Sequence, residues 1–184
     1  MFTLEATSPL SDRLPLLENP LLMQLIHIET HLAAPPERGF LLSLNIDLHK
    51  ASTTQTSESA IAGITSGIIG PSQTVTWQGR HFGLMLTHET LISQYDRPHH
   101  FQDIMLRGMF KSFIHDHYFD SQPDGTTFMR DELRFAAPLG PLGWLAETLV
   151  LRRYLTHFLA ERNNLIKTIA ESSEAIWQRY VANS

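Results

Sequence analysis

Cysteine is absent from this sequence of 184 residues. Disulfide bonds, thiolate nucleophiles and cysteine-ligated zinc sites are therefore excluded. Positive charge is also scarce, because 14 lysines and arginines stand against 19 aspartates and glutamates and leave a net charge of −5. Proteins that bind nucleic acid usually present a basic surface, so we expect no nucleic-acid partner.

Long apolar runs are missing as well. None approaches the roughly 18 residues that cross a bilayer, so we expect no stable membrane insertion. The N-terminal stretch carries Glu5 and Asp12 and lacks the basic-then-apolar order of a secretory signal, which favours a cytoplasmic protein. The glycine-containing segment 66–72 lacks the Lys-Ser/Thr ending of a phosphate-binding loop, and we expect no cofactor.

What the sequence does contain is typical of one folded domain, with 42% hydrophobic and 18% charged residues. Residues 1–21 hold Pro9, Pro15 and Pro20 without a sustained period, which indicates an irregular arm. Residues 22–184 form the predicted domain. Residues 22–33 favour a strand, and Pro36 then suits the first turn of a helix, where N–H groups have no intrahelical partner. Two short helices are predicted, over 36–45 and 46–52.

The middle of the chain is strand-like. Six segments, each followed by turn residues or a short break, are predicted as strands: 54–64, 74–79, 81–95, 99–108, 110–119 and 126–138. The predicted turns are Gln78-Gly79, Asp96-Arg97-Pro98, Arg107-Gly108 and Pro123-Asp124-Gly125. Short links between successive strands indicate antiparallel hairpins and hence a meander.

After Pro138 the apolar period changes from that of a strand to that of a helix. Neither proline nor glycine occurs from Trp144 onward, and apolar residues recur at helical spacing: Leu151, Leu155, Phe158, Leu159, Leu165, Ile166 and Ile169. This pattern predicts a long amphipathic helix, which must bury its apolar stripe against one face of the sheet. The predicted fold class is therefore α+β.

Three stretches, with their order, resemble the START-like or helix-grip superfamily, which includes polyketide cyclases/dehydrases, pollen-allergen-like proteins and lipid-transfer domains. They are "AAPPERGF", "LISQYDRPHHFQDIMLRGMFKSFIHDHYF" and "GTTFMRDELRFAAPLGPLGWLAE". The similarity covers roughly residues 22–170. It implies a curved antiparallel sheet of about seven strands, two short helices after the first strand, and a long C-terminal helix across the concave face, with a ligand cavity between sheet and helix.

Alternation along two strands predicts which side chains face that cavity. In the segment 110–119 one parity carries Phe113, His115 and His117, and the other carries the acids, including Asp116. We place the first set inward and expect Asp116 to face solvent. In the next strand Asp131 shares the more apolar parity with Leu133 and Phe135, and we expect its carboxylate opposite His115 or His117, within reach of a hydrogen bond.

The group of His115, His117 and Asp131 has three interpretations. The carboxylate could orient a histidine that acts as general acid or base, as a cyclase or dehydratase requires. Two histidines and an aspartate are also a legitimate set of metal ligands, but a third ligand must converge from a neighbouring strand, and we expect no metal. The third interpretation, which we favour, is that they satisfy one another in the wall of a half-polar pocket.

The function we expect is binding of a small hydrophobic or amphipathic ligand, without catalysis. The predicted lining residues are Trp77, His88, Phe113, His115, His117, Asp131, Leu133, Phe135, Leu155 and Phe158. The alternative is a cyclase/dehydratase-like enzyme that uses His115, His117 and Asp131. A third option is an interaction module whose cavity is filled by its own bulky side chains, and a homodimer is compatible with each of the three.

Overall fold

The computed structural model describes residues 23–136 and 150–182. Its elements, in chain order, are β1 (Gln24–Leu32), α1 (Pro36–Ser43), α2 (Ile46–Ser52), β2 (Ser59–Gly63), β3 (Thr74–His81), β4 (Leu84–Asp96), β5 (His100–Arg107), β6 (Ser112–Ser121), β7 (Thr127–Ala136), α4 (Arg152–Ala170) and α5 (Glu174–Val181). The N-terminal arm and the predicted start of the long helix at Trp144 lie outside the described residues.

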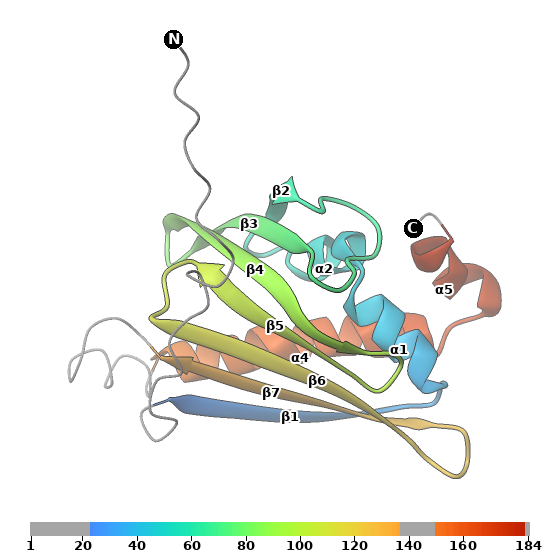
Figure 1. The fold of residues 1–184 in the computed structure, drawn as a ribbon. Coiled ribbons are helices and arrows are strands. Elements are labelled where there is room, and N and C mark those ends of the chain that lie inside the picture. The colour runs from blue at the N-terminus through green and yellow to red at the C-terminus, as the bar shows by residue number, and fades with distance from the viewer. Residues whose placement is uncertain (1–22, 137–149, 183–184) are drawn as a thin grey trace.

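Seven antiparallel strands form one sheet in the order β1-β7-β6-β5-β4-β3-β2. β2 to β7 follow one another as a meander, and β1 closes the far edge by pairing with β7. The predicted architecture, with two short helices after the first strand and a long C-terminal helix, is confirmed. Figure 1 shows α4 running across one face of the sheet, while α1 and α2 lie at one end of it.

Local sequence explains the two short helices. Pro36 occupies the first turn of α1, and the Asn45 side chain caps α2 by accepting a hydrogen bond of 2.7 Å from the Leu48 N–H. Phe40 of α1 is fully buried and packs edge-on against Phe101 and Phe119 of the sheet, with ring centroids 5.6 Å apart in both pairs. This aromatic packing fixes α1 over the strands.

One predicted turn is wrong. Gln78 and Gly79 lie inside β3, and the chain reverses instead at Phe82 and Gly83, whose φ values of 52° and 80° suit a tight hairpin turn. Gly79 has a packing role, because a Cβ atom there would lie 2.6 Å from Cγ of Glu58. The glycine therefore marks a close approach within a strand rather than its end.

The long C-terminal helix ends where its apolar pattern, whose last member is Ile169, indicates. α4 stops at Ala170, and a break at 171–173 precedes the separate helix α5. Arg38 of α1 stabilises this break by donating hydrogen bonds to the carbonyl oxygens of Ala170 (3.0 Å) and Ser172 (3.2 Å).

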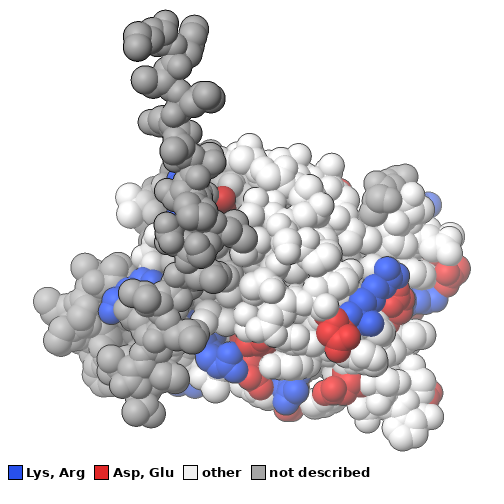
Figure 2. Space-filling model, viewed as in Figure 1, with Lys and Arg blue, Asp and Glu red and all other residues white. Residues whose placement is uncertain are grey.

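Among the described residues, no helix is long and apolar enough to cross a membrane. On the face shown in Figure 2, acidic and basic side chains are intermixed rather than gathered into a patch of one sign.

Candidate functional site

A cavity lies between α4 and the sheet. The volume open to the centres of water molecules is about 180 Å³, far more than the roughly 10–15 Å³ that one water needs. Its wall is mostly aliphatic and aromatic, drawn from the middle strands, α2 and α4. Phe82 lines it and is 53% exposed, so that end of the cavity reaches the surface. The third expected option required the protein's own side chains to fill this space. Those of the described residues do not fill it.

Eight of the ten predicted lining residues border the cavity: Trp77, His88, Phe113, His115, His117, Leu133, Leu155 and Phe158. Phe135 does not; it is fully buried in a core cluster with Ile26, Leu133 and Leu159. Asp131 does not border the cavity either; it lies behind the two histidines. Alternation along β6 and β7 therefore gives the face on which a side chain lies, whereas the packing around it decides whether it reaches the cavity.

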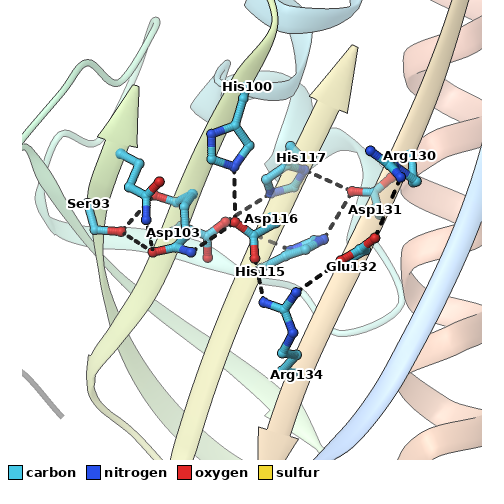
Figure 3. Close-up of polar contacts among 12 residues, drawn as sticks. Ser93, His100, Asp103, His115, Asp116, His117, Arg130, Asp131, Glu132 and Arg134 are labelled. Atoms are coloured by element: carbon cyan, nitrogen blue, oxygen red, sulfur yellow. Dashed lines mark hydrogen bonds and ion pairs between the residues drawn. The ribbon is translucent and has the colours of Figure 1, made fainter. Parts of the chain in front are cut away.

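The predicted contact between Asp131 and the histidines is present. His117 lies directly opposite Asp131 in the β6–β7 register. Oδ1 of Asp131 accepts a hydrogen bond of 3.0 Å from Nε2 of His115 and is 2.8 Å from Nδ1 of His117. Asp131 is 1% exposed, and Figure 3 shows the three side chains gathered together. One buried carboxylate thus holds two neighbouring imidazoles.

Asp103 of β5 completes this group, and the sequence argument missed it. Its Oδ2 atom lies 3.0 Å from Nε2 of His117 and 3.8 Å from Nδ1 of His115. Asp103 is paired with His115 in the β5–β6 register and lines the cavity. Asp103 lies two residues after the apolar Phe101, so alternation alone would have placed both on the same face of β5. Only the pairing of β5 with β6 shows that this position lies beside His115.

The helix α4 supplies the outer support of the cluster. Asn163 donates a hydrogen bond of 2.6 Å to Oδ2 of Asp131, and the guanidinium of Arg162 lies 3.9 Å from Oδ1. Arg162 also donates to the Ser43 carbonyl at 2.8 Å. Both oxygens of Asp131 are therefore engaged, and the carboxylate is fixed from the sheet and from the helix.

These contacts set the protonation of the cluster. Burial alone raises the pKa of Asp131, but the hydrogen bonds from His115 and His117 hold that pKa well below its usual value. For His117, burial lowers the pKa, yet the contacts with Asp103 and Asp131 outweigh it and raise the pKa. Burial and the neighbouring His117 together lower the pKa of His115. The two histidines are thus driven in opposite directions, His117 towards the charged form and His115 towards the neutral form.

A second carboxylate–imidazole cluster, also missed in the sequence, lies elsewhere on the cavity wall. Glu58 contacts His49 through Oε2 (2.7 Å) and His81 through Oε1 (3.1 Å), and His81 is 2.6 Å from the Tyr154 hydroxyl. Burial raises the pKa of Glu58, but the two histidines lower it to about 2. All four residues line the cavity, which is therefore polar at two separate places. Glu58 precedes a short strand with weak alternation, so its direction could not be predicted.

Asp116 corrects one expectation. It occupies the opposite face of the sheet, as predicted, but is 3% exposed rather than open to solvent. Its carboxylate accepts hydrogen bonds from His100 (3.0 Å), Gln102 (2.8 Å) and Arg134 (2.7 Å). Figure 3 shows Asp116 between His100 and Arg134, so His100 belongs to this network. Long side chains of neighbouring strands bury a group that alternation alone places outside.

Comparisons with known proteins show the fold. Neither a family model nor a curated protein matches the sequence. The solved structure of the di-domain ARO/CYC BexL from the BE-7585A biosynthetic pathway is similar with a TM-score of 0.66 at 14% identity, over 84% of this chain and 52% of that one. TTHA0849 from Thermus thermophilus (TM-score 0.61, 16% identity, 78% and 97% coverage) and ginseng major latex-like protein 151 from Panax ginseng (0.60, 14%, 81% and 98%) are also similar. The chain therefore has the helix-grip fold.

Proposed function

We propose that this protein binds a small amphipathic ligand in the cavity between α4 and the sheet. The observation that carries the proposal is a mostly apolar cavity of about 180 Å³ with two carboxylate–imidazole clusters in its wall. Binding pockets combine an apolar wall with a few placed polar groups in this way. The apolar wall supplies affinity for a hydrocarbon or aromatic body, and Asp103 offers an acceptor for a hydroxyl or amine group.

The similar structures support this proposal without identifying the ligand. BexL is described as a di-domain ARO/CYC, and the ginseng protein is described as latex-like. They share the fold with this chain at 14% identity, so neither transfers a substrate. The cavity itself is the stronger support.

A matched pair of variants tests the proposal. Val75 is buried and lines the cavity, whereas Ile61 on the adjacent strand β2 is 50% exposed. The uncharged fluorescent probe N-phenylnaphthylamine should bind the wild-type protein and Ile61→Phe equally. Val75→Phe should weaken binding at least about ten-fold, because the added ring occupies cavity volume. Absence of probe binding by folded wild-type protein, or equal binding by folded Val75→Phe, would contradict the proposal.

Native mass spectrometry of untagged protein identifies the natural ligand. The intact mass is compared with the denatured mass. A discrete additional mass that extracts into organic solvent would be the ligand, and its fragmentation would give the chemical class.

One observation favours a second function, that of a cyclase- or dehydratase-like enzyme. His115 and His117 have ring centroids 3.8 Å apart and pKa values displaced in opposite directions, one lowered and one raised. In this second function His115 would act as general base and His117 as general acid. Deuterium incorporation next to the carbonyl of an aryl ketone, followed by NMR, tests this activity. His115→Gln should slow exchange about 10²–10⁴-fold, whereas His100→Gln on the opposite face should not.

A further inference from the structure

The nitrogen atoms of His115 and His117 that point away from Asp131 converge on one oxygen of Asp103. Oδ2 of Asp103 is 3.0 Å from Nε2 of His117 and 3.8 Å from Nδ1 of His115. Within the described residues these three side chains are the one group whose ligand atoms all lie within 4.8 Å of one another. Donor atoms bonded to an ion at about 2.0–2.2 Å stand roughly 3.0–3.6 Å apart, and the two distances bracket that separation.

Asp131 prepares the two imidazoles for such an ion. It accepts a hydrogen bond from Nε2 of His115 and contacts Nδ1 of His117, which are the nitrogens that point away from Asp103. An ionised acceptor places a proton on each of those atoms and leaves the opposite lone pairs for a metal. A carboxylate behind a ligating histidine orients the ring and raises its basicity. Here a single carboxylate, itself bonded to Asn163, serves two rings.

We propose that Asp103, His115 and His117 bind a divalent first-row transition-metal ion at the cavity wall, with Asp131 as the group that orients both histidines. Two imidazoles and one carboxylate suit zinc, iron(II), cobalt(II) or manganese(II). Three protein ligands leave at least one coordination position, and the cavity lies on that side because all three residues line it. That position would take a water molecule or an oxygen atom of the cavity ligand.

This inference reverses the sequence-based expectation of no metal, which rested on the lack of a third converging ligand. Asp103 of β5 is that ligand, brought to the histidines by strand pairing. The site does not depend on the proposed amphipathic ligand. It does exclude the acid–base function while an ion is bound, because the metal would occupy the lone pairs that the proton transfer requires.

The cluster around Glu58 is a natural control, since it also joins a carboxylate to two imidazoles in the same cavity. His49 and His81 contact different oxygens of Glu58, at 2.7 and 3.1 Å, so their nitrogens do not converge on one point. We therefore expect no ion there. His49→Gln removes an imidazole from this cluster without touching Asp103, His115 or His117.

Metal titration of the untagged, chelator-treated full chain tests the proposal. Zinc binding is followed by competition with a chromophoric chelator, and cobalt(II) binding by its visible absorption. We expect one equivalent of ion for the wild type and for His49→Gln. Asp103→Asn and His115→Gln should abolish stoichiometric binding, and Asp131→Asn should weaken it about 10–100-fold.

Circular dichroism and thermal unfolding without metal establish that each variant is folded. Asp103→Asn is the decisive variant, because its side chain is 18% exposed and its loss disturbs the core least. Failure of the folded wild-type protein to retain one equivalent would overturn the proposal. Binding that persists in Asp103→Asn and His115→Gln, or that is lost in His49→Gln instead, would overturn it as well. Probe binding in the cavity is measured separately, so the two proposals can fail independently.

Discussion

The charge on Glu58 should stabilise the fold in a pH-dependent way, and Glu58→Gln tests this. Glu58 is held between His49 and His81, and its pKa falls from 4.5 to about 2 because both histidines donate to it, although burial opposes the shift. A group whose pKa is lower in the folded state stabilises the protein above the unfolded pKa. That stabilisation is lost as the pH falls through the folded value.

The size of the effect follows from the shift. Lowering the pKa of Glu58 from 4.5 to about 2 stabilises the folded protein by about 3 kcal/mol at neutral pH. Of this, about 1.3 kcal/mol should be lost between about pH 5.5 and about pH 3.5, while the unfolded chain takes up a proton and the folded chain does not. The Glu58→Gln variant lacks this contribution at every pH, because a glutamine amide does not titrate in this range.

Urea denaturation of both proteins at the two pH values measures the difference. Near pH 5.5 the free energy of unfolding of the wild type should exceed that of Glu58→Gln by about 3 kcal/mol. Near pH 3.5 this difference in the free energy of unfolding should be smaller by about 1.3 kcal/mol. Glu29→Gln is the control, since Glu29 is 52% exposed and its loss should change stability by less than about 0.5 kcal/mol. A gap that is constant with pH, or that widens on acidification, would refute the reasoning.

Two further comparisons test the described contacts. Asp131→Asn should lower the free energy of unfolding by about 3–5 kcal/mol because it breaks a buried charge network, and Asp116→Asn by about 1–3 kcal/mol because its three donors lose an ionised acceptor. Chemical denaturation would contradict this ranking if Asp116→Asn lowered the free energy of unfolding as much as Asp131→Asn does, or more. Gly63→Ala should cost at least about 3 kcal/mol, since φ is +72° and the new Cβ would lie 2.1 Å from the carbonyl oxygen of Thr74. Gly83→Ala, at φ +80° with nothing within 4 Å, should cost only about 1–2 kcal/mol, and equal melting temperatures for the two would argue against the clash.

The fold could be predicted because its signals are local. Strand alternation, turn residues and the helical period of 150–170 each lie within a short window of sequence, and together they indicated the seven strands and the long helix. The inward face of β6 and β7 followed from the same period of two. Local signals were misleading at Gln78-Gly79, which has the composition of a turn but lies inside β3. There the glycine allows the close approach of the Glu58 side chain.

The site could be predicted only in part, because its completion depends on pairing between distant segments. Asp103 reaches the histidines through the β5–β6 register, and the β4–β5 pairing contains irregularities that no local pattern reveals. Asp116 shows the converse limit. Its outward direction was predictable, but its burial comes from long side chains on neighbouring strands, including Arg134. Alternation gives the direction of a side chain, whereas the surrounding strands decide how deeply it is buried.

Buried and half-buried carboxylates of this protein differ in what remains free, and that difference locates the chemistry. Glu58 and Asp116 each have both oxygens engaged by neighbouring donors, and so does Asp131. Within the described residues, Asp103 is hydrogen-bonded through Oδ2 alone, while its side chain borders the cavity. An ionised carboxylate beside an apolar wall is costly unless a cation or donor compensates it. The three saturated carboxylates are compensated within the protein, whereas Asp103 has an oxygen left for whatever enters the cavity.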